Sequence, residues 1–178
     1  LLARLDQRFR LLTGGSRTAM ARQQTLRATI DWSFELLDES ERTVLTRASV
    51  FAGSWDLAAA EAVMADEREL GAIETMDVID VLTSLADKSL LNVESREVTR
   101  YRMLETIREY AAEKLAGHGA DANRALRRKH LDHYLYLAEF VAPRLQGREQ
   151  GIWLDRLEAD HDNFRAALVA ALDLDETE

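Results

Sequence analysis

Residues 90–111 read LLNVESREVTRYRMLETIREYA, and the spacing of the apolar residues changes within this stretch. Leu91 and Val93 alternate with polar residues, and the alternation resumes over residues 99–103 after a polar turn at residues 95–97. Strict alternation is the pattern of a strand with one buried face. The stretch therefore predicts an antiparallel hairpin, followed from Glu105 by a helix.

The alternation also assigns the side chains of the hairpin to two faces. The inner face is expected to carry Leu91, Val93, Thr99, Tyr101 and Met103. Arg100 and Arg102 fall between these positions and are expected to face outward, and Arg96 lies in the turn. The three arginines are candidates for contacts with phosphate, although Glu94 and Glu97 offset their charge.

Helical patterns lead up to the hairpin. Their expected bounds are 25–37 with Thr25 as cap, 38–52 with an acidic first turn, 57–65 with Asp56 as cap, and 76–88 with Thr75 as cap. The order of helices followed by a hairpin, with the helix at 76–88 as the third helix of the motif, is that of a winged helix, which we place at residues 25–118. Residues 1–24 are interpreted as a lead-in, with a helix over 1–12 and a glycine-containing linker over 13–16. Residues 66–72 are expected to form a loop.

Residues 119–178 are expected to be helical throughout. One long apolar face is formed by Leu126, His130, Tyr134, Leu137 and Val141, and Gly147 separates it from a second helix with Ile152, Trp153, Leu154 and Leu157. Residues 160–163 fit either a turn or a continuing helix, and Phe164, Leu168 and Leu172 carry the last apolar face. These helices predict the opening of a tetratricopeptide-like array, so the fold class is mainly α.

Composition supports a helical protein and sets limits on function. The 178 residues include one Pro, eight Gly and no Cys, which favours helix and excludes disulfides and thiolate metal sites. Neither a signal peptide nor an apolar run of membrane-spanning length is present, so a cytoplasmic location without membrane contact is expected. The chain begins at Leu1 within a helical pattern, and we interpret it as a fragment of a longer protein.

The net charge of −9 argues against a dedicated nucleic-acid-binding protein. Residues 1–30 nevertheless hold six Arg against one acid, and among them Arg17, Arg22 and Arg27 are candidates for phosphate contacts. They favour an alternative in which the chain is a stand-alone DNA-binding repressor. The third helix of the winged helix instead offers Asp77, Asp80, Ser84 and Asp87 with one Lys, and these carboxylates would repel DNA. A role in protein contact is therefore expected.

Catalytic and metal-binding patterns are weak. His130 and His133 lie three residues apart on one helix, a spacing that suits either a metal or structural packing, and packing is the favoured interpretation. Neither HExxH nor GxSxG occurs, so we expect no enzyme and no metal site in this segment.

Four blocks of sequence carry a resemblance to a known family: residues 4–63, 78–94, 100–116 and 153–168. Together they resemble bacterial STAND ATPase transcriptional regulators of LuxR and AfsR type, some of them fused to adenylate-cyclase-like domains. The resemblance implies an upstream nucleotide-binding domain that binds ATP or ADP in the parent protein, with no cofactor in this segment. It also implies that residues 1–12 end a helical lid and that DNA is contacted through another domain of the parent.

The resemblance further places Met103, Leu104 and Glu105 at a nucleotide-sensor position. Related proteins carry Met-His-Asp there, and Leu104 replaces the histidine that would approach the phosphate. Glu105 can alternatively cap the helix that follows. The expected partners are the nucleotide-binding domain of the same chain and a protein or small-molecule signal on the helical array. A helical scaffold protein is the third interpretation, and an open apolar face predicts a homo-oligomer or a bound partner.

Overall fold

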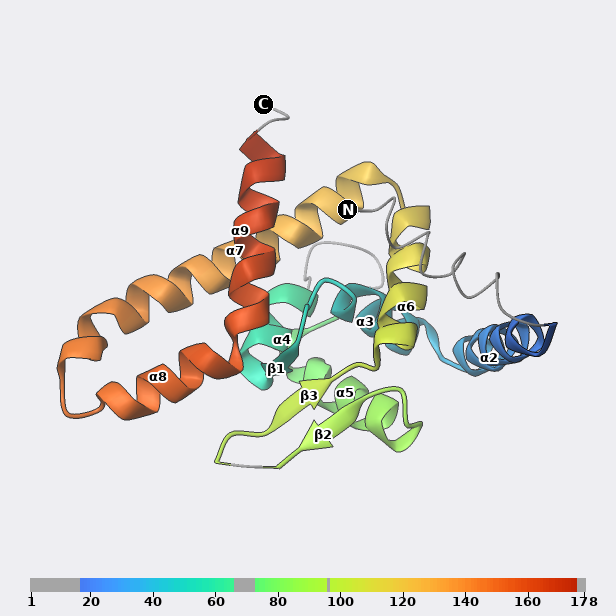
Figure 1. Cartoon of the computed structure of the whole chain (residues 1–178), viewed down its shortest axis with the longest axis horizontal. Helices are drawn as coiled ribbons and strands as arrows, with labels where there is room; N and C mark the ends of the chain where they lie inside the picture. Colours follow the sequence, from blue (N-terminus) through green and yellow to red (C-terminus); the bar gives the residue numbers. More distant parts are fainter. Residues whose placement is uncertain (1–16, 66–72, 96, 176–178) are drawn as a thin grey trace. The chain divides into compact units, whose positions relative to one another are not determined.

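The computed structural model describes residues 17–65, 73–95 and 97–175, and shows a mainly helical protein with a small antiparallel sheet (Figure 1). The chain divides between residues 37 and 38 into two compact units, which are described separately. The expectations for the helix at 1–12, the linker at 13–16, the loop at 66–72 and Arg96 lie outside the described residues.

In the first unit, helix α2 spans Arg17–Glu35. It runs straight through Thr25, so the expectation that Thr25 begins this helix is wrong. Residues 17–24 contain Ala, Met, Arg and Gln without a Gly or Pro, and such residues extend a helix rather than interrupt it.

Helix α3, Glu39–Ala48, begins where the acidic run predicts. The Asp38 side chain accepts from the Glu41 backbone N–H at 2.8 Å, and the Glu41 carboxylate accepts from the Asp38 N–H at 2.9 Å, which forms a capping box. The same carboxylate accepts from the Ser84 hydroxyl at 2.6 Å and pairs with Lys88, joining α3 to a later helix. Burial would raise the pKa of Glu41, but these hydrogen bonds outweigh it and lower the pKa.

The sheet contains three strands: β1 Ser54–Asp56, β2 Asn92–Glu94 and β3 Arg100–Arg102. They pair antiparallel in the order β1-β3-β2, with Tyr101 opposite both Trp55 and Val93. The expected hairpin of β2 and β3 is confirmed, whereas the expected inward position of Val93 is wrong, because its side chain is 45% exposed. The third strand, β1, was not expected.

Two helices separate β1 from the hairpin. Helix α4, Leu57–Met64, is capped by Asp56, which accepts from the Ala59 N–H at 3.0 Å, as expected. A 3₁₀ turn, η2 Thr75–Asp77, precedes helix α5, Val78–Asp87, and neither makes a side-chain cap. The expectation that Thr75 caps a helix over 76–88 is therefore wrong. The resulting order α3-β1-α4-α5-β2-β3 is a winged helix.

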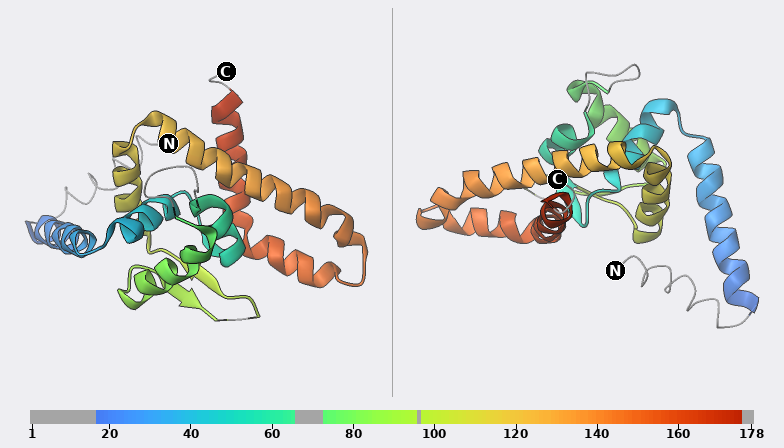
Figure 2. Two further views of the ribbon diagram at one scale, coloured as in Figure 1. Left: turned by 180° about the vertical axis from the view of Figure 1, so that it is seen from behind. Right: turned by 90° about the horizontal axis from the view of Figure 1, so that it is seen from above.

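The described residues after the sheet form helices in the order α6 Glu105–Gly117, α7 Ala120–Val141, η3 Ala142–Gln146, α8 Gln150–Ala159 and α9 His161–Asp175. Helix α8 runs back alongside α7, and α9 crosses and contacts α7 (Figures 1 and 2). Residues 160–163 were expected to be either a turn or continuing helix, and the structure shows a break at Asp160 alone, after which His161 begins α9.

One aromatic cluster joins the winged helix to these later helices. Phe51 stacks on Trp55 with 4.7 Å between ring centroids, and its edge meets the His130 ring on α7 at 5.3 Å. Tyr134, one turn further along α7, contacts Phe164 on α9 at 5.3 Å. The described residues between 38 and 175 therefore share one core on both sides of the domain boundary that we expected between residues 118 and 119. The domain bounds themselves stay a prediction.

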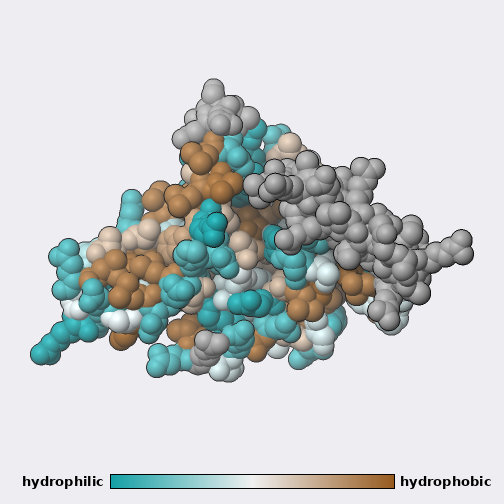
Figure 3. Space-filling model, viewed as in Figure 1, coloured by the Kyte–Doolittle hydropathy of each residue, from teal (hydrophilic) through white to brown (hydrophobic). Residues whose placement is uncertain are grey.

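The last helix does not bury the apolar face expected of it. Leu168 and Leu172 on α9 are 67% and 68% exposed, whereas the small residues Ala167 and Ala170 are buried. Small side chains allow the α9 backbone to approach its neighbours closely, which leaves the larger residues outside. Apolar side chains gather along this helix and on the α7–α8 hairpin in Figure 3. Among the described helices, none is long and apolar enough to cross a membrane.

The burial of His130 predicts a pH-dependent stability. Burial lowers the pKa of His130 to about 4, and a hydrogen bond with Asn163 opposes only part of this effect. The unfolded chain keeps a pKa near 6.5 and binds the proton more readily, so the free energy of unfolding falls as the pH drops from 6.5 towards 4. We expect His130 to contribute a loss of about 2 kcal/mol between pH 7 and pH 5.

Urea unfolding at the two pH values measures this contribution. His130→Gln should lose correspondingly less stability on acidification than the unmodified chain, because it has no proton to gain. His118→Gln, at an exposed position, serves as the control and should behave like the unmodified chain. An unchanged pH dependence in His130→Gln would contradict the assignment.

Candidate functional site

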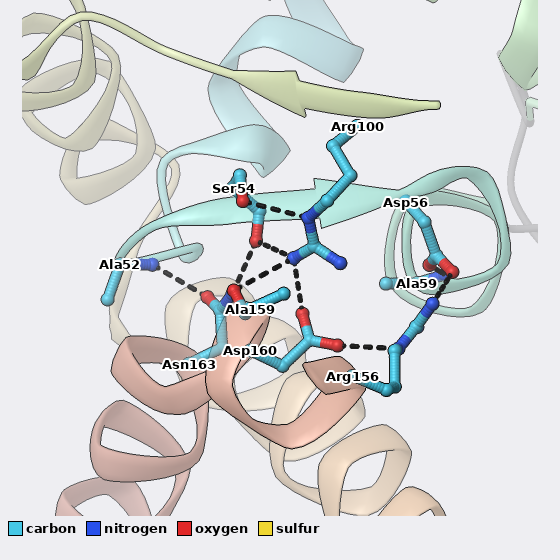
Figure 4. A network of polar contacts seen from close by, with 9 residues as sticks. All are labelled: Ala52, Ser54, Asp56, Ala59, Arg100, Arg156, Ala159, Asp160 and Asn163. Carbon is cyan, nitrogen blue, oxygen red and sulfur yellow. Dashed lines mark hydrogen bonds and ion pairs between the residues drawn. The ribbon is translucent and has the colours of Figure 1, made fainter. Parts of the chain in front are cut away.

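A buried polar network connects strand β3 of the winged helix to the turn between α8 and α9 (Figure 4). The Arg100 side chain is the centre of this network and is only 9% exposed. Its Nε donates to the Ser54 hydroxyl at 2.9 Å, and its terminal nitrogen donates to the Ser54 carbonyl at 2.7 Å, the Ala159 carbonyl at 3.1 Å and the Asp160 carboxylate at 2.6 Å. We call the nine residues drawn in Figure 4 the Arg100 network: Ala52, Ser54, Asp56, Ala59, Arg100, Arg156, Ala159, Asp160 and Asn163.

A second arginine completes the charge balance of the network. Arg156 on α8 lies 2.5 Å from the Asp56 carboxylate and 2.8 Å from the second oxygen of Asp160. Burial would raise the pKa of Asp56, but bonds from Arg156 and the Ala59 N–H lower it, so Asp56 stays ionised. Two carboxylates then face two guanidinium groups, and no net charge is left buried.

Asn163, in the first turn of α9, connects this region to β1 and the loop before it. Its amide nitrogen donates to the Ser54 carbonyl at 2.9 Å, and its oxygen accepts from the Ala52 N–H at 2.9 Å. Asn163 and Asp160 are both fully buried. The turn between α8 and α9 therefore supplies the polar partners that the backbone around Ser54 and the wing strand require.

The network corrects the expected orientation of the wing. Arg100 was expected on the outer face, and this is wrong, because α8 and α9 cover that face and Asp160 pairs with the guanidinium. A contact between Arg100 and phosphate would require this pair to open. Arg102, two residues later on β3, does face outward, with 55% of its side chain exposed and a 4.0 Å contact to Glu94.

Helix α5 occupies the position of a recognition helix, and its outer face is acidic. Four exposed carboxylates, those of Glu74, Asp77, Asp80 and Asp87, belong to this helix or its approach. Met76 and Ile79 lie among them and are 81% and 42% exposed. Lys88, at the end of this helix, forms an ion pair with Glu41 and therefore does not offset these carboxylates. We call these six residues, Glu74, Met76, Asp77, Ile79, Asp80 and Asp87, the α5 surface.

The remaining candidate residues do not converge on one site. Arg17, Arg22 and Arg27 belong to α2 in the first unit, and of these only Arg27 has a described side chain, which is exposed.

At the proposed sensor position, Met103 is buried and Leu104 is 52% exposed. Leu104 occupies the N-cap position of α6 and Glu105 lies within the helix, where it pairs with Arg108 at 2.6 Å, so the expectation that Glu105 caps this helix is wrong. His130 and His133 both pack against the Tyr134 ring, which agrees with the structural interpretation of the two histidines.

Comparison with known proteins identifies the class of domain. Residues 37–116 match the family of the winged helix-turn-helix domain, the same region in which the structure shows α3 to α6 and the wing. The match agrees with the winged-helix fold that the structure shows in this region. No solved structure matches the chain.

The curated relatives are mycobacterial. A protein of Mycobacterium tuberculosis named "Putative HTH-type transcriptional regulator" is 44% identical over 165 residues, which are 92% of this chain and 18% of that protein. A Mycobacterium bovis protein of the same name matches equally. An uncharacterized protein of M. tuberculosis is 43% identical over 133 residues, 74% of this chain and 33% of that protein. The chain spans about a fifth of the length of the regulators.

The family match and these names agree with the expectation that the segment is not an enzyme. They leave open which surface of the winged helix makes functional contacts.

The Arg100 network predicts a large cost for removing its central cation. Arg100→Met should destabilise the protein by about 3 kcal/mol or more, because it leaves Asp160 buried with an incomplete set of partners. Arg102→Met on the same strand removes only an exposed contact and should cost less than about 0.5 kcal/mol. Chemical denaturation of the two variants measures the difference, and similar costs would show that the network contributes little.

Proposed function

We propose that this chain is a regulatory interaction module of a larger transcriptional regulator, in which the winged helix contacts protein rather than bases. The observation that carries the proposal is the α5 surface. A helix that reads DNA presents Arg, Lys, Asn or Gln to base edges and phosphates. Here the corresponding face presents carboxylates and two apolar side chains.

Charge strengthens this argument. Within residues 74–88 there are four carboxylates and one amine, which gives a net charge of −3 on the element that would enter the major groove. Phosphate contacts by Lys and Arg supply most of the affinity for DNA, so this face opposes binding. Exposed Met and Ile with a charged rim suit a protein partner, which would bury the apolar pair and supply basic residues.

The finer form of the proposal follows the resemblance to STAND regulators of LuxR and AfsR type. In that form the partner of the α5 surface is the nucleotide-binding domain of the same parent chain, which binds ATP or ADP. Helices α7 to α9 belong to a tetratricopeptide-like array that receives a protein or small-molecule signal. DNA is contacted through another domain of the parent. The names of the relatives support transcriptional regulation as the setting.

Direct DNA binding is the second candidate. The winged helix-turn-helix match and the relatives named as HTH-type regulators favour it, and Arg102 on the wing faces outward. In this alternative, Arg17, Arg22 and Arg27 would add phosphate contacts from the first unit.

A DNA-binding measurement separates the two candidates. We expect the 178-residue chain to show no sequence-dependent retention of duplex DNA in about 50 mM salt, because the α5 surface repels phosphate. Fluorescence anisotropy with a pool of duplexes, repeated at rising salt, gives the result. A steep salt dependence together with a sequence preference would favour the second candidate and overturn the first.

The protein contact can be tested on the parent. The nucleotide-binding part of the parent, produced separately, should bind this chain, and Asp80→Arg should weaken the complex at least about tenfold by reversing the charge within the α5 surface. Asp155→Arg makes the same change in net charge at an exposed position on α8 and should leave the affinity unchanged. Equal affinities for the two variants would show that the α5 surface is not the site of contact.

A further inference from the structure

A pocket of about 550 Å³ opens where the winged helix meets the later helices. Its walls come from the loop after α3, the first turns of α6, the middle of α7 and one face of α9. The volume falls within the range of small-molecule sites. Because the winged helix and the later helices both contribute to the pocket, a ligand bound there would contact both of them at once.

The polar part of the wall contains three guanidinium groups. Arg108 makes two hydrogen bonds with Glu105, at 3.0 and 2.6 Å, and Arg127 contacts Asp173 at 2.6 Å. Both carboxylates are more than half exposed, and such pairs exchange readily for another anion. Arg165 on α9 has no ion-pair or hydrogen-bond partner among the described residues.

The inner wall is apolar and contains one buried polar group. Five small or branched residues line it: Val50, Ala52, Ala166, Val169 and Ala170. His130 also lines the pocket, is 1% exposed, and has an Nε2 atom without a hydrogen-bond partner. Asp162 is the second carboxylate on the wall, besides Glu105, so cations outnumber anions by three to two.

We propose that this pocket binds a small organic anion, with a phosphate or carboxylate head held by the arginines and a short apolar body against the inner wall. Guanidinium groups present paired donors that match the oxygens of both heads. Arg165, which has no partner in the part of the chain that the structure describes, provides a first contact, and Arg127 and Arg108 can turn from their exposed partners to the ligand. The proposal deepens the proposed function, since it assigns a site and a chemical class to the small-molecule signal.

Such a ligand would stabilise the packing of the winged helix against helices α7 and α9. It would bridge Arg108 on α6 and Arg165 on α9, in addition to the contacts that the Arg100 network makes between the wing and the α8–α9 turn. A compound that binds only this arrangement raises its stability in proportion to the logarithm of its concentration. Occupancy of the pocket would thereby be transmitted to the winged helix.

The test is a titration of the 178-residue chain, followed by isothermal calorimetry and by amide chemical shifts. The probes are phenyl phosphate, benzoate, inorganic phosphate and phenol. We expect phenyl phosphate or benzoate to bind with a saturable shift of α6 and α9 amides, at least about tenfold more tightly than inorganic phosphate or phenol. Comparison of phenyl phosphate with benzoate identifies the preferred head.

Two variants test the site without disturbing the core, and a third at a distant exposed position is the control. Arg165→Met should weaken binding at least about tenfold, and Arg148→Met, at an exposed position before α8, should not change it. Val169→Glu adds a repelling carboxylate to the wall at a position that is 55% exposed, and should also weaken binding.

The proposal is overturned if neither organic anion saturates, if inorganic phosphate binds as tightly as phenyl phosphate, or if Arg165→Met and Arg148→Met bind alike. Asp80→Arg should bind the probes normally, because the α5 surface lies outside the pocket. A failure of the pocket and a failure of the proposed protein contact are therefore distinguishable.

Discussion

The buried pair of Arg100 and Asp160 determines how the described part of residues 38–175 is assembled. An arginine at the centre of a wing strand would ordinarily face water, and here it lies under the turn between α8 and α9. A charge in that position is tolerable only with a complete set of partners, which come from Ser54, Asp160 and a backbone carbonyl. Neither the wing nor the later helices can satisfy these groups alone.

This constraint bears on function. The winged helix is joined to the later helices by an ionic network and by the aromatic cluster around Phe51, whereas the α5 surface is outside both contacts. The wing strand β3 is thus covered by the later helices, whereas the α5 surface remains available to a partner. Asp160, just before α9, pairs with Arg100 on the wing, and Asn163 on α9 donates to the Ser54 carbonyl on β1, so the start of α9 is in direct contact with the sheet.

The sequence predicts those features that depend on near neighbours. The acidic start of α3, the cap at Asp56, the β2–β3 hairpin and the long face of α7 each follow from residues within a few positions of one another. Strand β1 could not be predicted, because it has only three residues and all of them are buried, so its apolar and polar residues do not alternate. The burial of Arg100 could not be predicted from the sequence either, since its partner Asp160 is 60 residues away.

The candidate site was predictable only in part. The acidic outer face of the third helix follows directly from Asp77, Asp80 and Asp87, once that helix is placed. The pocket could not be foreseen, because its arginines come from three different helices.

The most direct test of the central claim, that the wing and the later helices form one cooperative unit, is native-state hydrogen exchange. Our account predicts that the buried amides of α3 and α9 open with the same free energy and with the same dependence on denaturant. If α9 opened at much lower free energy while α3 stayed protected, the two parts would be independent and the account would be contradicted.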